Sequence, residues 1–169
     1  MMDVYALRHG KAEERTLSVK SDSRRKLTES GKKELRCISK AIKSMDIRFD
    51  CIFSSPLLRA RQTAEIIYSQ VKCKKQSIVF WDELKPEFDT DKIIQRLSAL
   101  KPDSSVLLVG HEPVLSRLVG TVISSNDCHV SIALKKGGFA HVQCHMQDSK
   151  ISGTLRSIMT PRQLRILCK

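Results

Sequence analysis

Short apolar runs alternate along this chain with segments whose apolar residues recur at helical spacing. The runs that predict the first strands are residues 3–8, 51–53, 77–81 and 105–109. The segments of helical period are 28–45, 56–70, 91–100 and, after Pro113, the stretch from Leu115 to Val122. Because parallel strands are joined by long crossovers, usually helices, this alternation is typical of an α/β domain with a mainly parallel sheet. We expect a three-layer αβα sandwich.

The last part of the chain has a different pattern. Residues 130–134, 139–145 and 151–158 carry period-two or branched residues, which predict an antiparallel portion of the sheet, and Thr160-Pro161 predicts a short final helix. One connection is long, because residues 10–27 are polar and charged while the other loops are short. A loop of this kind is usually functional or mobile, and we expect it to face the substrate.

The length of 169 residues suits one compact domain, and we expect a single domain over residues 1–169. With 41% hydrophobic and 28% charged residues, the composition is that of a globular protein rather than a disordered one. No apolar run reaches the ~18 residues that a membrane span needs, and the first residues lack a secretory signal pattern. The six cysteines form no C-x-x-C pair, which favours free thiols. These features predict a cytoplasmic protein with no membrane partner.

The charge balance indicates an anionic partner. Lysine and arginine total 30 against 18 acidic residues, a formal net charge of +12. Phosphate, a phosphorylated protein and a nucleic acid all carry the complementary charge. Nucleic-acid sites interleave aromatic with basic side chains, but aromatic residues make up only 5% of this chain. A basic nucleic-acid-binding module is therefore an alternative that rests on the charge alone.

Three polar side chains follow the ends of predicted strands. His9 comes directly after the first strand and His111 after the fourth, each beside a glycine that lets the backbone approach a ligand closely. Arg59 lies one turn into the helix predicted from Ser55-Pro56, in which Ser55 is the expected N-cap. Arg61 shares this segment, and the residues alone do not separate it from Arg59. Because ligands of open parallel sheets bind beyond the carboxyl ends of the strands, we expect these side chains to share a site.

Three motifs occur here in a combination that resembles a known family. The segments R-H-G at 8–10, S-S-P-L-L-R-A-R-Q-T-A at 54–64 and G-H-E-P at 110–113 resemble, in order and spacing, the histidine phosphatase superfamily, also called the phosphoglycerate mutase-like family. The short length and the segments 22–31 and 158–161 look like its SixA-type phosphohistidine phosphatase branch. The likeness covers nearly the whole chain, and the pattern S-P-x-x-R selects Arg59.

This resemblance implies a phosphatase that requires neither a metal ion nor a cofactor. Neutral His9 would attack phosphorus in line and form a phosphohistidine intermediate, which water would hydrolyse. Arg8, Arg59 and His111 would hold the three non-bridging oxygens of the phosphoryl group. The backbone of Gly10 would approach the substrate closely. We therefore expect four catalytic residues, with Gly10 as an additional binding residue.

Two further site residues are candidates. Many relatives place an acidic residue after the third strand to protonate the leaving group, and Glu83 is the best match to it in the segment 82–86. A solvated loop carboxylate is an equally good interpretation of Glu83. Arg25, in the long polar loop, is a candidate for substrate binding.

A metal site is not expected at the remaining histidines. His141 and His145 have a spacing that resembles zinc ligands, but on a strand the neighbouring Cys144 points away from both, and no fourth ligand is near.

The favoured substrate is phosphohistidine in a protein. A short chain without large insertions leaves the pocket open, which suits a substrate carried by a protein. The alternative with the same chemistry is a small phosphomonoester, since a likeness of fold does not decide the substrate.

Overall fold

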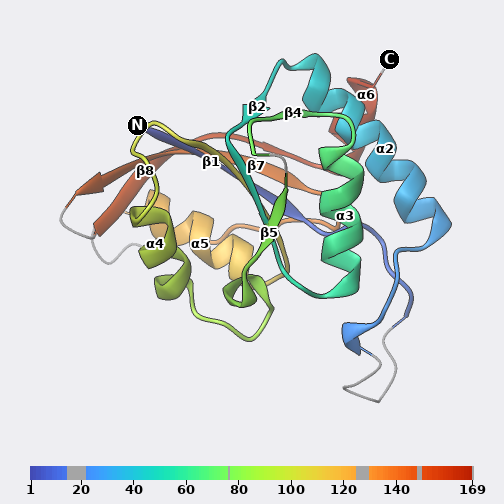
Figure 1. Cartoon of the computed structure of the whole chain (residues 1–169), viewed down its shortest axis with the longest axis horizontal. Coiled ribbons are helices and arrows are strands. Elements are labelled where there is room, and N and C mark those ends of the chain that lie inside the picture. The colour runs from blue at the N-terminus through green and yellow to red at the C-terminus, as the bar shows by residue number, and fades with distance from the viewer. Residues whose placement is uncertain (15–21, 76, 125–129, 148–149, 169) are drawn as a thin grey trace.

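The computed structural model describes residues 1–14, 22–75, 77–124, 130–147 and 150–168. These residues include a six-stranded sheet with the strand order β5-β3-β6-β1-β7-β8 (Figure 1). Its strands are β1 (Met2–Arg8), β3 (Cys51–Ser54), β5 (Ile78–Phe80), β6 (Ser105–Gly110), β7 (Phe139–Gln147) and β8 (Lys150–Met159). The helices are α2 (Glu29–Ser44), α3 (Leu58–Tyr68), α4 (Thr90–Ser98), α5 (Val114–Ile123) and α6 (Pro161–Ile166), with a 3-10 turn η1 at Asp82–Leu84. None of the described helices is both long and apolar enough to span a bilayer.

The sheet is parallel over most of its width. Strands β5, β3, β6 and β1 pair in parallel, and β7 and β8 add antiparallel pairings at one edge. This confirms the predicted α/β fold with a mainly parallel sheet and an antiparallel portion. Arg8 pairs with Gly110, and Ser54 with Val109, so β1, β6 and β3 end at the same edge. The polar residues that follow these strands therefore come together there.

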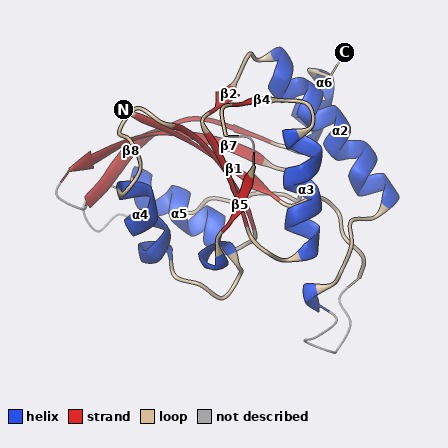
Figure 2. Cartoon of the chain, viewed as in Figure 1, coloured by secondary structure: helices blue, strands red, loops and turns tan. Residues whose placement is uncertain are grey.

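Helices cover both faces of the sheet, with α2, α3 and α6 on one face and α4 and α5 on the other (Figure 2). Strand β1 shows the reason. Its Val4 and Ala6 pack into the core under α4 and α5, whereas Tyr5 and Leu7 pack into the core under α2 and α3. Because successive side chains of a strand point to opposite faces, the consecutive apolar residues 4–7 need cover on both faces. The predicted three-layer sandwich is confirmed.

Two details of the sheet differ from the predictions. The prediction of a strand at 130–134 is wrong, because these residues form none. The edge of β1 is paired with β7 instead. Leu134 instead turns its carbonyl oxygen toward Arg8, which donates to it from Nη1 at 2.7 Å. Two short strands, β2 (Arg48–Phe49) and β4 (Lys72–Cys73), pair in a separate small sheet that was not predicted. Strands of two residues are too short to show an alternating pattern.

Candidate active site

His9 and His111 lie beside each other at the carboxyl ends of β1 and β6. The backbone N–H of His9 donates to the carbonyl oxygen of Gly110 at 3.0 Å, which continues the pairing of the two strands. The imidazole rings have centroids 4.8 Å apart. Both residues are buried, with exposures of 6% for His9 and 2% for His111. The register of a parallel sheet thus brings together two histidines that are distant in the sequence.

The hydrogen bonds around Gly10 set the orientation of His9. His9 Nδ1 lies 2.7 Å from the carbonyl oxygen of Gly10. Since a carbonyl oxygen can only accept, Nδ1 carries the proton of the neutral ring and Nε2 keeps its lone pair. The Gly10 N–H donates to Thr63 Oγ1 on α3 at 3.1 Å, and a Cβ at Gly10 would lie 2.6 Å from Leu35 Cδ1. Gly10 is thus packed tightly, and its N–H, which belongs to the backbone expected to approach the substrate, donates inside the protein.

Arg59 reaches the histidines from the first turn of α3 and is only 3% exposed. Its Nη1 donates to the backbone carbonyl of Asp22 at 2.9 Å, and its Nη2 lies 3.3 Å from the Asp22 carboxylate. The same carboxylate pairs with Arg25, whose Nε is 2.8 Å from Asp22 Oδ1. Arg25 Nη1 in turn donates to the carbonyl oxygen of Glu13 at 2.8 Å. The end of the long loop therefore packs against Arg59.

These side chains line a pocket of about 580 Å³. Five of the predicted site residues border it: Arg8, His9, Arg25, Arg59 and His111. The rest of its lining is mostly charged and consists of Lys11, Ala12, Glu13, Glu14, Asp22, Pro86, Glu112 and Lys136. A polar pocket at the carboxyl edge of a parallel sheet is suited to an anionic ligand.

Ser55 has a different role from the predicted N-cap, so that prediction is wrong. Helix α3 begins at Leu58, and its N-cap is Leu57, which makes no capping bond through its side chain. Ser55 Oγ accepts a hydrogen bond from the Leu57 N–H at 3.3 Å and lies 3.0 Å from His111 Nε2. The hydroxyl group therefore supports the turn before α3 and contacts His111.

Both histidines are held in the neutral form. Burial lowers the pKa of His9 to about 3, against the opposing effect of the Gly10 hydrogen bond, and the charges of Arg59 and Arg8 lower it further. The pKa of His111 is lowered to about 2, mainly by burial. The neighbouring charges of His9, Arg59 and Arg8 lower it further. At neutral pH His9 can thus act as a nucleophile.

The lowered pKa values predict that the stability depends on pH. Below the ordinary histidine pKa of about 6.5, the unfolded chain binds protons that the folded protein excludes, so the free energy of unfolding falls by about 1.4 kcal/mol per pH unit for each histidine. This loss begins near pH 6.5 and continues toward the folded-state pKa of His9, about 3. Urea unfolding between pH 7 and pH 5 measures it. We expect a shallower pH slope for His111→Gln than for the wild type, and equal slopes would contradict the argument.

Comparison with known proteins shows the family. A model of the histidine phosphatase superfamily (branch 1) matches residues 4–89, which include Arg8, His9 and Arg59. The phosphohistidine phosphatase SixA of Escherichia coli (strain K12) is 33% identical over 120 residues, which cover 70% of this chain and 72% of that protein. The chain belongs to the histidine phosphatase superfamily.

The similarity of this histidine phosphatase to known proteins extends over most of its length. An uncharacterized protein of Picosynechococcus sp. is 31% identical over 156 residues, which cover 87% of this chain and 92% of that protein. A solved structure of the protein histidine phosphatase SixA, complexed with tungstate, has a TM-score of 0.83 at 28% identity and covers 96% of this chain and 99% of that chain. The chain is thus SixA-like and a hydrolase of the phosphatase class, which confirms the resemblance seen in its motifs.

Glu83 lies outside the pocket of this histidine phosphatase. It belongs to η1, its side chain is 15% exposed, and its Oε1 lies 3.0 Å from Arg96 Nε on α4. Arg96 also packs over the ring of Trp81. The carboxylate expected to protonate the leaving group therefore forms an ion pair between η1 and α4. The carboxylates that line the pocket are Glu13, Glu14, Asp22 and Glu112.

Six charged residues of the pocket were not predicted individually as site residues: Lys11, Glu13, Glu14, Asp22, Glu112 and Lys136. Glu112 directly follows His111, and Asp22 lies three residues before Arg25. Both are therefore close in sequence to residues that were predicted for the site, and this proximity could have indicated them. Lys136 had no such signal, because two adjacent lysines at the end of an apolar segment are typical of a solvated surface.

His141 has a structural role on β7. Its Nε2 lies 2.7 Å from Asp3 Oδ1, and its ring stacks on Tyr5 with centroids 4.2 Å apart. Among the residues that the structure describes, no three histidine, cysteine, aspartate or glutamate side chains gather as a metal-binding group.

Proposed function

We propose that this phosphatase hydrolyses phosphohistidine in proteins, without a metal ion, through a covalent intermediate on His9. The observation that carries the proposal is the hydrogen bond from His9 Nδ1 to Gly10, which leaves Nε2 of a buried neutral ring with its lone pair. The phosphoryl group moves from the substrate nitrogen to His9 Nε2. The substrate imidazole, which carries a proton on its other nitrogen, leaves as the neutral ring when its P–N bond breaks. Water then attacks phosphorus, releases inorganic phosphate and regenerates neutral His9.

Arg8, Arg59 and His111 are suited to bind the phosphoryl oxygens. Arg8 is held by the Leu134 carbonyl, and its buried Nε forms no hydrogen bond with any described residue. Fixed donors around the three oxygens stabilise the charge that develops in the transition state. A bound phosphate also favours the imidazolium form of His111, whose pKa burial lowers in the free protein. Two arginines and one histidine can then supply the charge that a metal ion supplies in other phosphatases.

The leaving group supports phosphohistidine as the substrate. An oxygen leaving group needs a proton from an acid, but Glu83 is paired with Arg96 outside the pocket. An imidazole nitrogen depends less on such an acid, because the substrate ring can itself carry the proton. The name of the Escherichia coli relative, phosphohistidine phosphatase, agrees with this choice. The described cysteines are free thiols, which fits the reducing cytoplasm in which we expect the enzyme to act.

A small phosphomonoester is the second candidate substrate. Asp22 and Glu112 both line the pocket and are carboxylates of the kind that could protonate an oxygen leaving group. The experiment that separates the candidates is an assay of purified protein against phosphohistidine peptides and a panel of phosphomonoesters. We expect a kcat/KM for the peptides at least tenfold above that for any phosphomonoester. A reversed ratio would overturn the proposed substrate.

Activity should survive exhaustive chelation. Because Arg8, Arg59 and His111 are placed to neutralise the phosphoryl charge, we expect treatment with a chelator to change kcat/KM by less than about twofold. The measurement compares untreated, chelated and metal-supplemented enzyme on one phosphohistidine peptide. Loss of turnover on chelation that a single metal restores would contradict the metal-independent mechanism.

A further inference from the structure

The loop 134–138 is fastened to the end of β1, next to His9. Arg8 Nη1 donates to the Leu134 carbonyl at 2.7 Å, and the Arg8 N–H donates to the Gly138 carbonyl at 3.1 Å. In the reverse direction, the Gly137 N–H lies 3.0 Å from the carbonyl oxygen of Arg8 and 3.1 Å from that of His9. The loop is thus positioned by the same two residues that carry the proposed chemistry.

A tight turn within this loop directs its two lysines differently. The Gly138 N–H donates to the Lys135 carbonyl at 2.6 Å, and Gly137 has a φ of +76°. This is the pattern of a type II turn, whose third residue needs a left-handed conformation and is therefore usually glycine. Lys136 is the second residue of the turn and lines the pocket, whereas Lys135 does not. Both lysines are exposed.

Lys136 stands at the rim of the pocket. Its positive charge acts on His9, but less strongly than the charges of Arg59 and Arg8. The pocket carboxylate of Asp22 is already paired with Arg25 and Arg59. Within the described part of the chain, Lys136 forms no ion pair. Its ammonium group is therefore available to an anion that enters the pocket.

We propose that Lys136 binds a carboxylate of the protein substrate next to the phosphohistidine. The inference rests on the proposed function, in which Arg8, Arg59 and His111 already serve the three phosphoryl oxygens. The ammonium group of Lys136 at the rim would therefore contact the substrate outside its phosphoryl group. In a protein, the anionic side chains available to an ammonium group are aspartate and glutamate. The enzyme would thus prefer acidic sequences around the phosphohistidine.

The test compares Lys136→Ala with Lys135→Ala, a matched control for the loss of one exposed lysine from the same turn. Two phosphohistidine peptides are used, which differ only by an aspartate or an alanine beside the phosphorylated residue. For the acidic peptide at low salt, we expect Lys136→Ala to raise KM about fivefold with kcat unchanged, in line with an exposed ion pair. We expect a change below about twofold for the alanine peptide and for Lys135→Ala on both peptides, and the difference should shrink at high salt.

Two outcomes would overturn this role of Lys136. If Lys136→Ala raises KM equally for both peptides, Lys136 binds the phosphoryl group and not the neighbouring carboxylate. If Lys135→Ala has the same effect as Lys136→Ala, the effect of Lys136 comes from general surface charge. If the wild type hydrolyses neither peptide, the proposed function fails, but Lys136 stays testable through binding of the same peptides measured by calorimetry. Equal affinity of the wild type and Lys136→Ala for the acidic peptide would then reject the proposal.

Discussion

His9→Ala is expected to lower turnover by at least about 10⁴-fold while the protein stays folded. The reason is that covalent catalysis through Nε2 is the proposed route, and removal of a nucleophile eliminates that route instead of weakening it. Rapid mixing with phosphate-labelled substrate, followed by a denaturing quench at alkaline pH, should trap label on the wild type. The trapped label should be lost in acid, as expected for phosphohistidine, and the variant should trap none.

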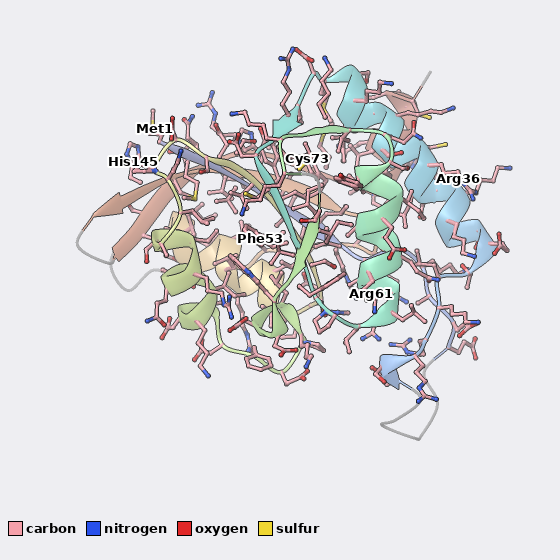
Figure 3. All side chains as sticks on the ribbon, in the orientation of Figure 1. Met1, Arg36, Phe53, Arg61, Cys73 and His145 are labelled. Atoms are coloured by element: carbon pink, nitrogen blue, oxygen red, sulfur yellow. The ribbon has the colours of Figure 1, made fainter. Side chains whose placement is uncertain are left out.

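His145→Ala is the matched control for this experiment. His145 is an exposed histidine on β7 and lies near the N-terminal Met1 (Figure 3), and it is not among the residues that line the pocket. Its removal should leave both turnover and trapped label unchanged. Circular dichroism and thermal unfolding show whether each variant is folded. Rapid turnover by folded His9→Ala would reject the covalent mechanism.

Arg59→Ala is expected to lower kcat/KM by about a hundredfold or more, roughly 3 kcal/mol, whereas Arg61→Ala should lower it by less than about tenfold. Arg59 is buried and lines the pocket near His9. Arg61 is exposed near the N-terminal end of α3 (Figure 3), and its guanidinium lies 5.0 Å from the ring centroid of Phe80. A contact of this kind at an exposed site contributes about 0.5–1 kcal/mol and has no connection with the phosphoryl group.

Arg59→Lys separates the shape of the side chain from its charge. Because an ammonium group cannot reproduce the planar fork of a guanidinium, we expect this variant to recover only a small part of the lost activity. Full recovery would show that charge alone is needed at this position. If Arg61→Ala is the more damaging variant under identical conditions, with both variants folded, the assignment of Arg59 to the phosphoryl group is wrong.

The centre of the site could be predicted because its residues are tied to strand ends. His9 and His111 each lie two residues after a run of consecutive apolar residues, 4–7 and 106–109, which predicts a strand buried on both faces. Parallel pairing then puts the ends of β1 and β6 at one edge, whatever the details of the loops. The first turn of the helix after β3 faces the same edge, which brings Arg59 and Arg61 near the site, and the pattern S-P-x-x-R of the histidine phosphatase superfamily then selected Arg59.

The surroundings of that centre could not be predicted in the same way. The segment 130–134 has the composition of a strand, yet it forms none, because β7 already pairs with the edge of β1. Ser55 has the residue type of an N-cap, but its hydroxyl group contacts His111, which a parallel pairing brings beside it. In both cases a tertiary contact replaced the local preference.

The sequence by itself determined the layers, the edge of the sheet that carries the site and the two histidines that meet there, because periodicity and strand ends are local properties of the chain. Only the tertiary structure decided the directions of the Glu83 and Lys136 side chains. Glu83 turns to Arg96 on α4, and Lys136 reaches the pocket because Arg8 and His9 hold its loop. Such side chains have several rotatable bonds, so their direction depends on partners that folding brings near them, which no local pattern contains.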